Sequence, residues 1–381
     1  MGTSESTSLG RVETRIVRVA GPERPLRLES GETLGRLDVA YETYGELNAD
    51  RSNAVVVCHA LTGDANAAGH HGDPQRPGWW DTIIGPGKAV DTERYHVVSS
   101  NLLGGCAGTT GPSSDDPATG APYGLRFPSF TVRDLVTVHR LLLAELGIER
   151  PLAAMGGSLG GMQVLQWGLD HPSELGAGLV ICASSRLTDQ NIAFSTVGRH
   201  AIMSDPDFQD GDYYGSGRAP ARGLAVARMM AHITYLSQEG MSRKFGREVR
   251  EGRDARDLGP AFEVESYLHH QGERFVRRFD ANTYLYLSRV MDIFEPFDDP
   301  SVPDDVSGNG TAFHVVSFDS DWRFDTTQSL EIVRNLEKRG ADVRFAEIST
   351  HWGHDAFLLP LPELHRLVQD ALAEAAGALG R

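Results

Sequence analysis

A serine in a glycine-rich segment is the first candidate for chemistry in this chain. Residues 156–160 read Gly-Gly-Ser-Leu-Gly, directly after an apolar run at 152–155 and before a helical pattern at 162–169. Glycines two positions before and after Ser158 let neighbouring backbone pass a tight turn without Cβ clashes. The turn would expose the hydroxyl at a helix N-terminus, where amides favour negative charge. We interpret Ser158 as a nucleophile; the alternative is a glycine-rich turn that happens to contain serine.

Such a serine needs a histidine base and an acid that orients it, in the chain order Ser, Asp, His. Three acids follow the apolar run 312–318, namely Asp319, Asp321 and Asp325. Two histidines, His351 and His354, follow the run 343–348. Asp321 and His354 are 33 positions apart, which is enough for one helix and one strand that return to the same edge of a parallel sheet. Spacing alone leaves open which acid and which histidine take part.

An acyl intermediate also needs two amide donors for its oxyanion. The amide of Leu159 follows the nucleophile directly, and we expect the second from Leu61, in the segment 58–63 after the apolar run 54–58. His59 in the same segment could act as a base. We favour a structural role in hydrogen bonding for it.

Short runs rich in β-forming residues recur along the chain and predict strands. They lie at 37–44, 54–59, 95–99, 152–155, 178–183, 312–318 and 343–348. Several are apolar throughout, which is typical of parallel strands covered on both faces. Helical patterns at 132–146, 327–338 and 364–376 alternate with them. This alternation predicts the α/β class, with a mostly parallel sheet flanked by helices.

The alternation stops between residues 185 and 297, where the sequence is predominantly helical. We predict a core domain from residues 1–184 and 298–381 and a helical lid inserted at 185–297. Within the insertion, apolar residues recur at helical spacing over 221–237.

Composition excludes several classes of protein. With 36 basic and 52 acidic residues the net charge is −16, and no Lys/Arg-rich block stands out. Nucleic acid and anionic membrane are therefore not expected as principal partners. No window approaches 18 uninterrupted apolar residues, and the N-terminus has no apolar signal segment. Three cysteines without a C-x-x-C pair indicate neither disulfides nor a zinc site. We expect a cytoplasmic protein without a metal.

Taken together, these segments resemble the homoserine O-acyltransferases of the α/β-hydrolase fold over nearly the whole chain. The matching segments are 59–63 (HALTG), 77–80 (PGWW), 85–87 (GPG), 101–106 (NLLGGC), 111–112 (GP), 156–161 (GGSLGG), 190–194 (QNIAF) and 353–358 (GHDAFL). The resemblance implies that Ser158 is the nucleophile, Asp321 the orienting acid and His354 the base. It also implies that Arg228 and Asp355 hold the amino-acid substrate.

The resemblance further implies a ping-pong transfer in methionine biosynthesis. An acyl-CoA thioester would acylate Ser158, and the hydroxyl of L-homoserine would then accept the acyl group. Coenzyme A is here a substrate, so no bound cofactor is expected. Arg228 would pair with the homoserine carboxylate and Asp355 with its ammonium group; without the resemblance, Arg228 would read as part of a solvated helix face. Family members are typically homodimers, with lid helices contributing to the interface.

The identity of the acyl group depends on Arg323, two residues after Asp321. Acetyl-CoA users commonly carry an apolar residue there, whereas an arginine could pair with the terminal carboxylate of a succinyl group. We therefore favour succinyl-CoA over acetyl-CoA. The alternative is that Arg323 points to solvent or pairs with Asp319 or Asp325. A serine O-acyltransferase, a hydrolase and a catalytically silent binding protein of the same fold are further alternatives.

Overall fold

The computed structural model describes residues 8–256, 258–308 and 310–378. In them, eight strands form one sheet in the order β1-β4-β8-β5-β9-β10-β11-β12. In that order the bounds are Arg15–Ala20, Leu37–Tyr44, His96–Ser100, Ala54–Cys58, Ala153–Gly157, Ala177–Ile181, Ala312–Phe318 and Asp342–Ile348. Two-residue strands pair outside it, β2 (Leu26–Arg27) with β3 (Thr33–Leu34) and β6 (Ile84–Gly85) with β7 (Val90–Asp91).

The sheet is parallel from β8 to β12 and antiparallel only where β4 joins β1 and β8. Strands β5, β9 and β10 are buried at every residue, which agrees with their apolar sequences. The predicted α/β class with a mostly parallel sheet is confirmed. The edge strand β1 was not predicted, because its mostly exposed residues lack the apolar pattern of a buried strand.

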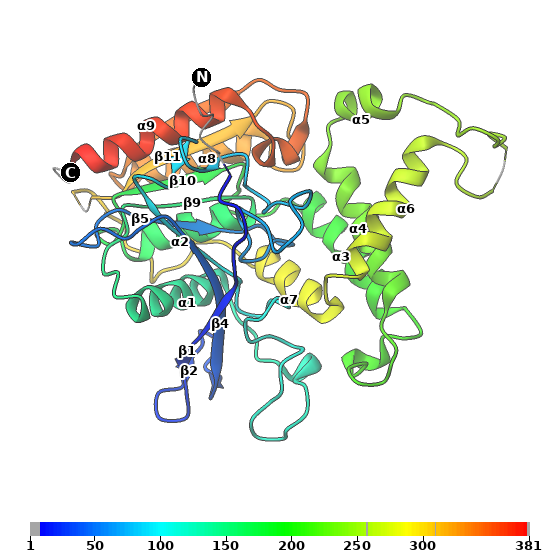
Figure 1. Cartoon of the computed structure of the whole chain (residues 1–381), viewed down its shortest axis with the longest axis horizontal. Coiled ribbons are helices and arrows are strands. Elements are labelled where there is room, and N and C mark those ends of the chain that lie inside the picture. The colour runs from blue at the N-terminus through cyan, green and yellow to red at the C-terminus, as the bar shows by residue number, and fades with distance from the viewer. Residues whose placement is uncertain (1–7, 257, 309, 379–381) are drawn as a thin grey trace.

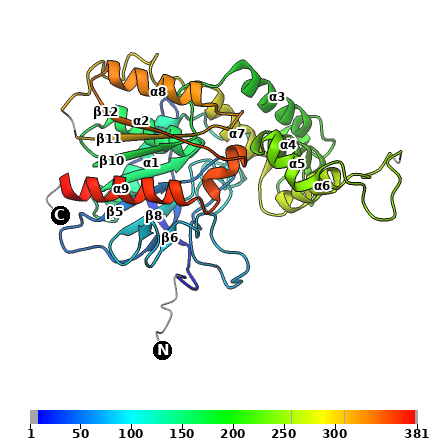
Figure 2. The same cartoon turned by 90° about the horizontal axis from the view of Figure 1, so that it is seen from above.

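Helices cover both faces of the sheet (Figures 1 and 2). The helices α1 (Val132–Glu145), α2 (Leu159–Asp170) and α8 (Thr326–Lys338) contribute to one hydrophobic core, and α9 (Pro362–Ala378) contributes to the other. Successive residues of β5 divide between them: Val56 joins the first core, and Val55 and Val57 join the second. Burial on both faces holds the carboxyl ends of the central strands at one common edge.

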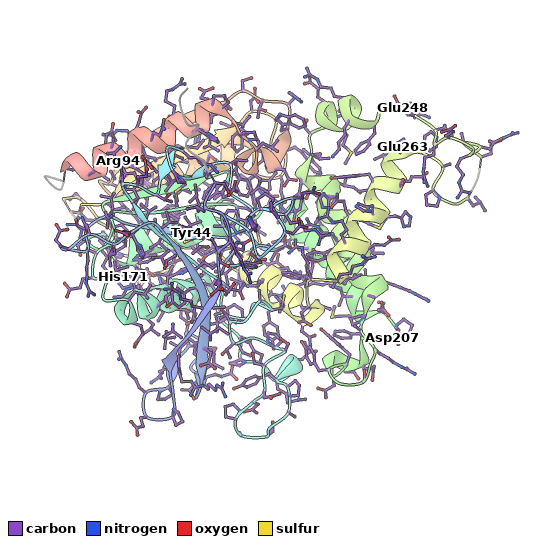
Figure 3. The ribbon with its side chains drawn as sticks, in the orientation of Figure 1. Tyr44, Arg94, His171, Asp207, Glu248 and Glu263 are labelled. Carbon is purple, nitrogen blue, oxygen red and sulfur yellow. The ribbon has the colours of Figure 1, made fainter. Side chains whose placement is uncertain are left out.

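The chain between β10 and β11 forms a group of helices beside the sheet domain, at the right of Figure 1. They are α3 (Asp189–Met203), α4 (Ala221–Tyr235), α5 (Gln238–Phe245), α6 (Glu263–Val276) and α7 (Ala281–Asp292). We call residues 185–297 the lid. Helix α4 packs between α3 and α6. Glu248 and Glu263 lie at the far end of the lid, remote from Tyr44 in the sheet domain (Figure 3). There the amide of Glu263 donates to the carbonyl of Glu248.

Buried polar contacts fix the lid internally and against the core. Arg199 of α3 forms an ion pair with Asp292 at the end of α7, at 2.7 Å, with side chains only 7% and 3% exposed. The indole of Trp322, in the loop after β11, donates to the carbonyl of Leu236 after α4 at 3.0 Å. None of the helices in the described ranges combines the length and apolar character needed to cross a membrane.

Candidate active site

Ser158 lies at the junction of β9 and α2 in a strained backbone conformation, with φ 58° and ψ −125°. The conformation is held by close packing of the flanking glycines. A Cβ on Gly156 would lie 2.7 Å from the carbonyl oxygen of Cys58, and one on Gly160 would lie 2.1 Å from the same atom. Only glycine fits at either position, so β5, β9 and α2 together hold this turn. The side chain of Ser158 therefore emerges at the carboxyl edge of the sheet.

Asp321 and His354 form a buried hydrogen-bonded pair. Nδ1 of His354 donates to Oδ2 of Asp321 at 2.7 Å, and both residues are 2% exposed. The other oxygen, Oδ1, accepts from the amides of Arg323 and Phe324 at 2.9 and 3.0 Å. With both carboxylate oxygens occupied, the carboxylate is fixed in place. Nε2 of His354 is left as the atom that can exchange a proton.

The rival acid and histidine are engaged elsewhere. Asp319 accepts from the hydroxyl of Ser349 and the amide of Thr350. The Nδ1 atom of His351 lies 3.4 Å from Nη1 of Arg243, and its carbonyl accepts from Ser237. Among the candidates left open by the sequence, the structure joins only Asp321 and His354.

The strand order explains how this pair comes to the serine. Ser158, Asp321 and His354 follow β9, β11 and β12, which lie at one parallel edge with β10 between β9 and β11. The residue after β10 is Cys182, whose Sγ lies within 4.8 Å of ligand-type atoms of Asp321 and His354. Burial raises the pKa of the Cys182 thiol well above its usual value. His354 and Asp321 are joined by a hydrogen bond and the thiol is kept protonated, an arrangement that suits proton transfer.

The two amides predicted to hold the oxyanion are not engaged elsewhere. In the described chain, neither the Leu61 amide nor the Leu159 amide donates a hydrogen bond outside regular helix pairing. The side-chain amide of Gln163 donates to the carbonyls of His59 and Leu159, at 3.3 and 3.0 Å. Gln163 therefore ties the loop that carries Leu61 to the first turn of α2.

His59 holds this loop from its other side. Its Nδ1 donates to the carbonyl of Ala60 at 2.7 Å, and its Nε2 accepts from the amide of Leu102 at 3.2 Å. Burial lowers the pKa of His59, which keeps the ring neutral. These contacts agree with the structural role that we favoured for His59.

Arg228 and Asp355 both lie near His354. The ring of Tyr235 lies 5.9 Å from that of His354 and 5.6 Å from the Arg228 guanidinium. Arg228 also donates to Oγ1 of Thr62 at 3.1 Å. Asp355 directly follows His354, and no cation lies within 4.0 Å of its carboxylate in the part of the chain described. Burial raises the pKa of Asp355, partly offset by His354 and Arg228.

Arg323 is buried, with 7% exposure. Its Nη1 donates to Oγ1 of Thr234 at 2.8 Å, and its guanidinium lies 5.8 Å from the Tyr235 ring. Asp325 caps α8 through the amide of Gln328. The Arg323 guanidinium thus neither points to solvent nor pairs with Asp319 or Asp325, and within the described residues no carboxylate lies within 4.0 Å of that guanidinium. A buried guanidinium without a counter-ion is costly, so this position favours an anionic ligand.

Some residues at the site carried only weak signals in the sequence. Tyr235 lies seven residues after Arg228, which is helical spacing but assigns it no role, and Thr234 carried no signal. Asn191, in the segment 190–194 quoted for the resemblance, donates to the carbonyl of Arg323 at 2.7 Å. Its contact fixes the loop that carries both Asp321 and Arg323.

Comparison with known proteins agrees with this geometry. Residues 53–359 match the family model described as alpha/beta hydrolase fold. A homoserine O-succinyltransferase of Nocardioides sp. is 56% identical, over 96% of this chain and 99% of its own. A homoserine O-acetyltransferase of Rhodospirillum rubrum is 52% identical, over 94% and 92%. The crystal structure of a homoserine O-acetyltransferase from Bacillus anthracis superposes with a TM-score of 0.85 at 26% identity, covering 96% of this chain and 98% of that one.

Proposed function

The chain belongs to the homoserine O-acyltransferase family of the α/β-hydrolase fold, and from this premise we propose that it transfers an acyl group from a coenzyme A thioester to the hydroxyl of L-homoserine. The observation that carries the proposal is the buried His354–Asp321 pair at the same sheet edge as the strained Ser158. The product would be an O-acylhomoserine, an activated intermediate for methionine biosynthesis.

The first half-reaction acylates the serine. Nε2 of His354 takes the proton of Ser158 Oγ as that oxygen attacks the thioester carbonyl carbon. The amides of Leu61 and Leu159 stabilise the resulting oxyanion. When the intermediate collapses, the carbon–sulfur bond breaks and the coenzyme A thiolate receives the proton from His354. Asp321 stabilises the imidazolium and keeps Nε2 directed at the reacting atoms.

The second half-reaction transfers the acyl group to homoserine. His354 takes the proton of the homoserine hydroxyl, whose oxygen attacks the ester carbon, and then returns that proton to Ser158. Arg228 binds the substrate carboxylate and Asp355 its ammonium group, which supports an amino-acid acceptor. An Asp355 carboxylate without an ion-pair partner in the described residues and the Arg228 guanidinium, both near His354, match the two charges of such an acceptor.

We favour succinyl-CoA as the donor. The buried, unpaired guanidinium of Arg323 would bind the terminal carboxylate of a succinyl group beside the reacting carbonyl. An acetyl group offers it no partner. The acetyl-CoA-dependent reaction is the second candidate, since relatives at 56% and 52% identity carry the two different names.

A coenzyme A release assay tests this function. We expect rapid, continuous release from succinyl-CoA only when homoserine is present, slower release from acetyl-CoA, and background release by Ser158→Ala. Equal release with and without homoserine would instead identify a hydrolase. Testing serine in place of homoserine measures how strongly the site discriminates against an acceptor that is shorter by one methylene. A pocket discriminates against such a difference by only about 1–3 kcal/mol.

Two further properties belong to the proposal. The lid carries exposed apolar side chains on α3 (Val197 and Met203) and α4 (Val226 and Ile233), which supports a homodimer formed through the lid. We also propose that the enzyme is cytoplasmic. We further propose that it needs no resident cofactor or metal, since every proton and acyl transfer above uses groups of this chain or of the two substrates.

A further inference from the structure

Five arginines line a pocket of about 370 Å³ where the lid meets the loops of the core. Arg228 comes from α4, Arg274 from the last turn of α6, and Arg277 and Arg278 from the residues just after α6. Arg76 comes from the core loop that precedes β6. The pocket concentrates positive charge in a chain whose net charge is −16.

These charges are poorly neutralised by the protein itself. Of the five, only Arg76 has a carboxylate within 4.0 Å in the part of the chain described, namely Asp73 at 3.5 Å. Burial, and then the neighbouring Arg228, lower the pKa of Arg278, while Asp64 acts in the opposite direction. Like charges this close repel one another. An anion in the pocket would remove the repulsion.

The inner part of the pocket is ordered around one aromatic ring and one threonine. The guanidinium groups of Arg228 and Arg278 lie 4.8 and 5.3 Å from the centre of the Phe275 ring. Arg228 donates to the hydroxyl of Thr62 and Arg278 to its carbonyl, at 3.1 and 2.9 Å. Because Thr62 follows Leu61 in the chain, this end of the pocket adjoins the loop assigned to the oxyanion.

The outer part of the pocket opens to solvent. Arg274 and Arg277 are exposed, as is Arg278, but in the described ranges neither Arg274 nor Arg277 forms an ion pair or a hydrogen bond. The pocket therefore extends from Arg228, which contacts Thr62 beside the oxyanion loop, to the surface, with ordered guanidinium groups inside and free ones outside. A ligand that suits it reacts at one end and carries several negative charges at the other.

We propose that the outer arginines of this pocket, Arg274 and Arg277, bind the phosphate groups of the acyl-CoA donor. The inference rests on the proposed function, which puts the thioester at Ser158. The flexible pantetheine arm of coenzyme A separates the thioester from a diphosphate and a 3′-phosphate. Planar guanidinium groups bind phosphate oxygens in pairs. Arg228 stays with the homoserine carboxylate at the inner end.

The test compares ligands with and without phosphates on three variants, Arg274→Gln, Arg277→Gln and the double variant. We expect the Kd of coenzyme A, measured by calorimetry, to rise about 3–5-fold in each single variant and about tenfold or more in the double variant. Arg222→Gln removes the same charge from an exposed position of α4 outside the pocket. It should leave the Kd unchanged.

Kinetics with truncated donors assign the effect to the phosphates. In the wild type, kcat/KM should be higher for the coenzyme A ester than for the matching pantetheine ester, and the double variant should lose most of that ratio. Dephospho-coenzyme A, which lacks the 3′-phosphate, separates the 3′-phosphate from the diphosphate. Equal Kd values in wild type and double variant, or an unchanged ratio between the two esters, would overturn the proposal.

Calorimetry with coenzyme A alone separates this inference from the proposed function. If coenzyme A binds and the double variant weakens it, the phosphate site stands even if homoserine is not the acceptor. If homoserine is acylated normally but the double variant binds coenzyme A as tightly as the wild type, the function stands and the phosphate site is wrong.

Discussion

Nδ1 of His354 donates to Oδ2 of Asp321 at 2.7 Å, at the carboxyl ends of two adjacent parallel strands. The carboxylate of Asp321 has a second function. Its other oxygen accepts from the amides of Arg323 and Phe324. The loop that orients the histidine is therefore the loop that carries Arg323, so the base and the residue proposed to select the acyl group share one support.

Asp321→Asn should lower kcat by about 10⁴-fold, because an amide at this position no longer stabilises the imidazolium and can favour the wrong histidine tautomer. Asp319→Asn is the matched control, since the Asp319 carboxylate accepts from Ser349 and Thr350, whereas His354 donates to Asp321. It should change kcat by less than about threefold. Steady-state kinetics of coenzyme A release measures both, and a comparable loss in the two variants would contradict our assignment of the acid.

Homoserine binding should weaken as the pH falls. The weakening should begin at a higher pH than the pKa of an ordinary aspartate would cause. Burial raises the pKa of Asp355, so its carboxylate takes up a proton at a higher pH than usual and loses its attraction for the ammonium group. The KM of homoserine should rise toward acidic pH. Asp355→Asn should raise that KM about tenfold at neutral pH and flatten its acidic rise. If the wild type and the variant have parallel pH profiles, another group controls binding.

Arg323→Leu should reverse the donor preference. It removes the guanidinium that would pair with the succinyl carboxylate and leaves an apolar pocket wall. The ratio of kcat/KM for succinyl-CoA to that for acetyl-CoA should fall about 10- to 100-fold, as expected for the loss of a hydrogen-bonded charge pair. Arg323→Lys keeps the charge and should retain part of the ratio. An unaltered ratio in Arg323→Leu would place donor selection elsewhere.

The stability of the fold should decrease on acidification through His139. Burial lowers the pKa of His139 to about 4, and its ring contacts Ser100 and Gln163. The unfolded chain protonates this group near its ordinary pKa of about 6.5, so between these values the unfolded state binds more protons and the folded state loses relative stability. The contribution is about 2 kcal/mol at pH 5 relative to pH 8.

Denaturant titrations of wild type and His139→Gln at pH 5 and pH 8 measure this effect. The variant should show a smaller fall in the free energy of unfolding between the two pH values. If the glutamine at position 139 leaves Gln163 without its hydrogen bond and the variant does not fold, NMR titration of the wild-type His139 ring measures its pKa directly. A His139 ring that titrates near pH 6.5 would contradict the prediction.

Charged residues on the exposed face of α4 should dissociate the proposed dimer. Val226 and Ile233 are seven residues apart on this helix and are 44% and 40% exposed. Val226→Glu with Ile233→Glu should shift the protein from dimer to monomer in analytical ultracentrifugation. Arg334→Glu in α8 with Arg366→Glu in α9, both at exposed positions away from the lid, provides the control. A wild type that sediments as a monomer would contradict the proposed homodimer.

Much of this molecule could be predicted from local sequence. The strand Ala312–Phe318 has its predicted bounds, and α4 and α8 begin within one residue of theirs. These elements depend on short-range patterns, namely apolar runs, helical periodicity and glycines that tolerate a tight turn. The same local logic identified Ser158, because its strand–turn–helix setting is contained in a few consecutive residues. By contrast, β1 was missed because it lies exposed at the sheet edge.

Only the tertiary structure decided among residues that are distant in sequence. Spacing could not separate Asp319 from Asp321 or His351 from His354, because both members of each pair follow the same strand; the direction of each side chain depends on the register of β11 with β12 and on the turns that follow. The buried position of Arg323 depends on Thr234 of the lid, and the arginine pocket draws on α4, α6 and a core loop. Local sequence determines which elements form, whereas the convergence of charges depends on how those elements pack.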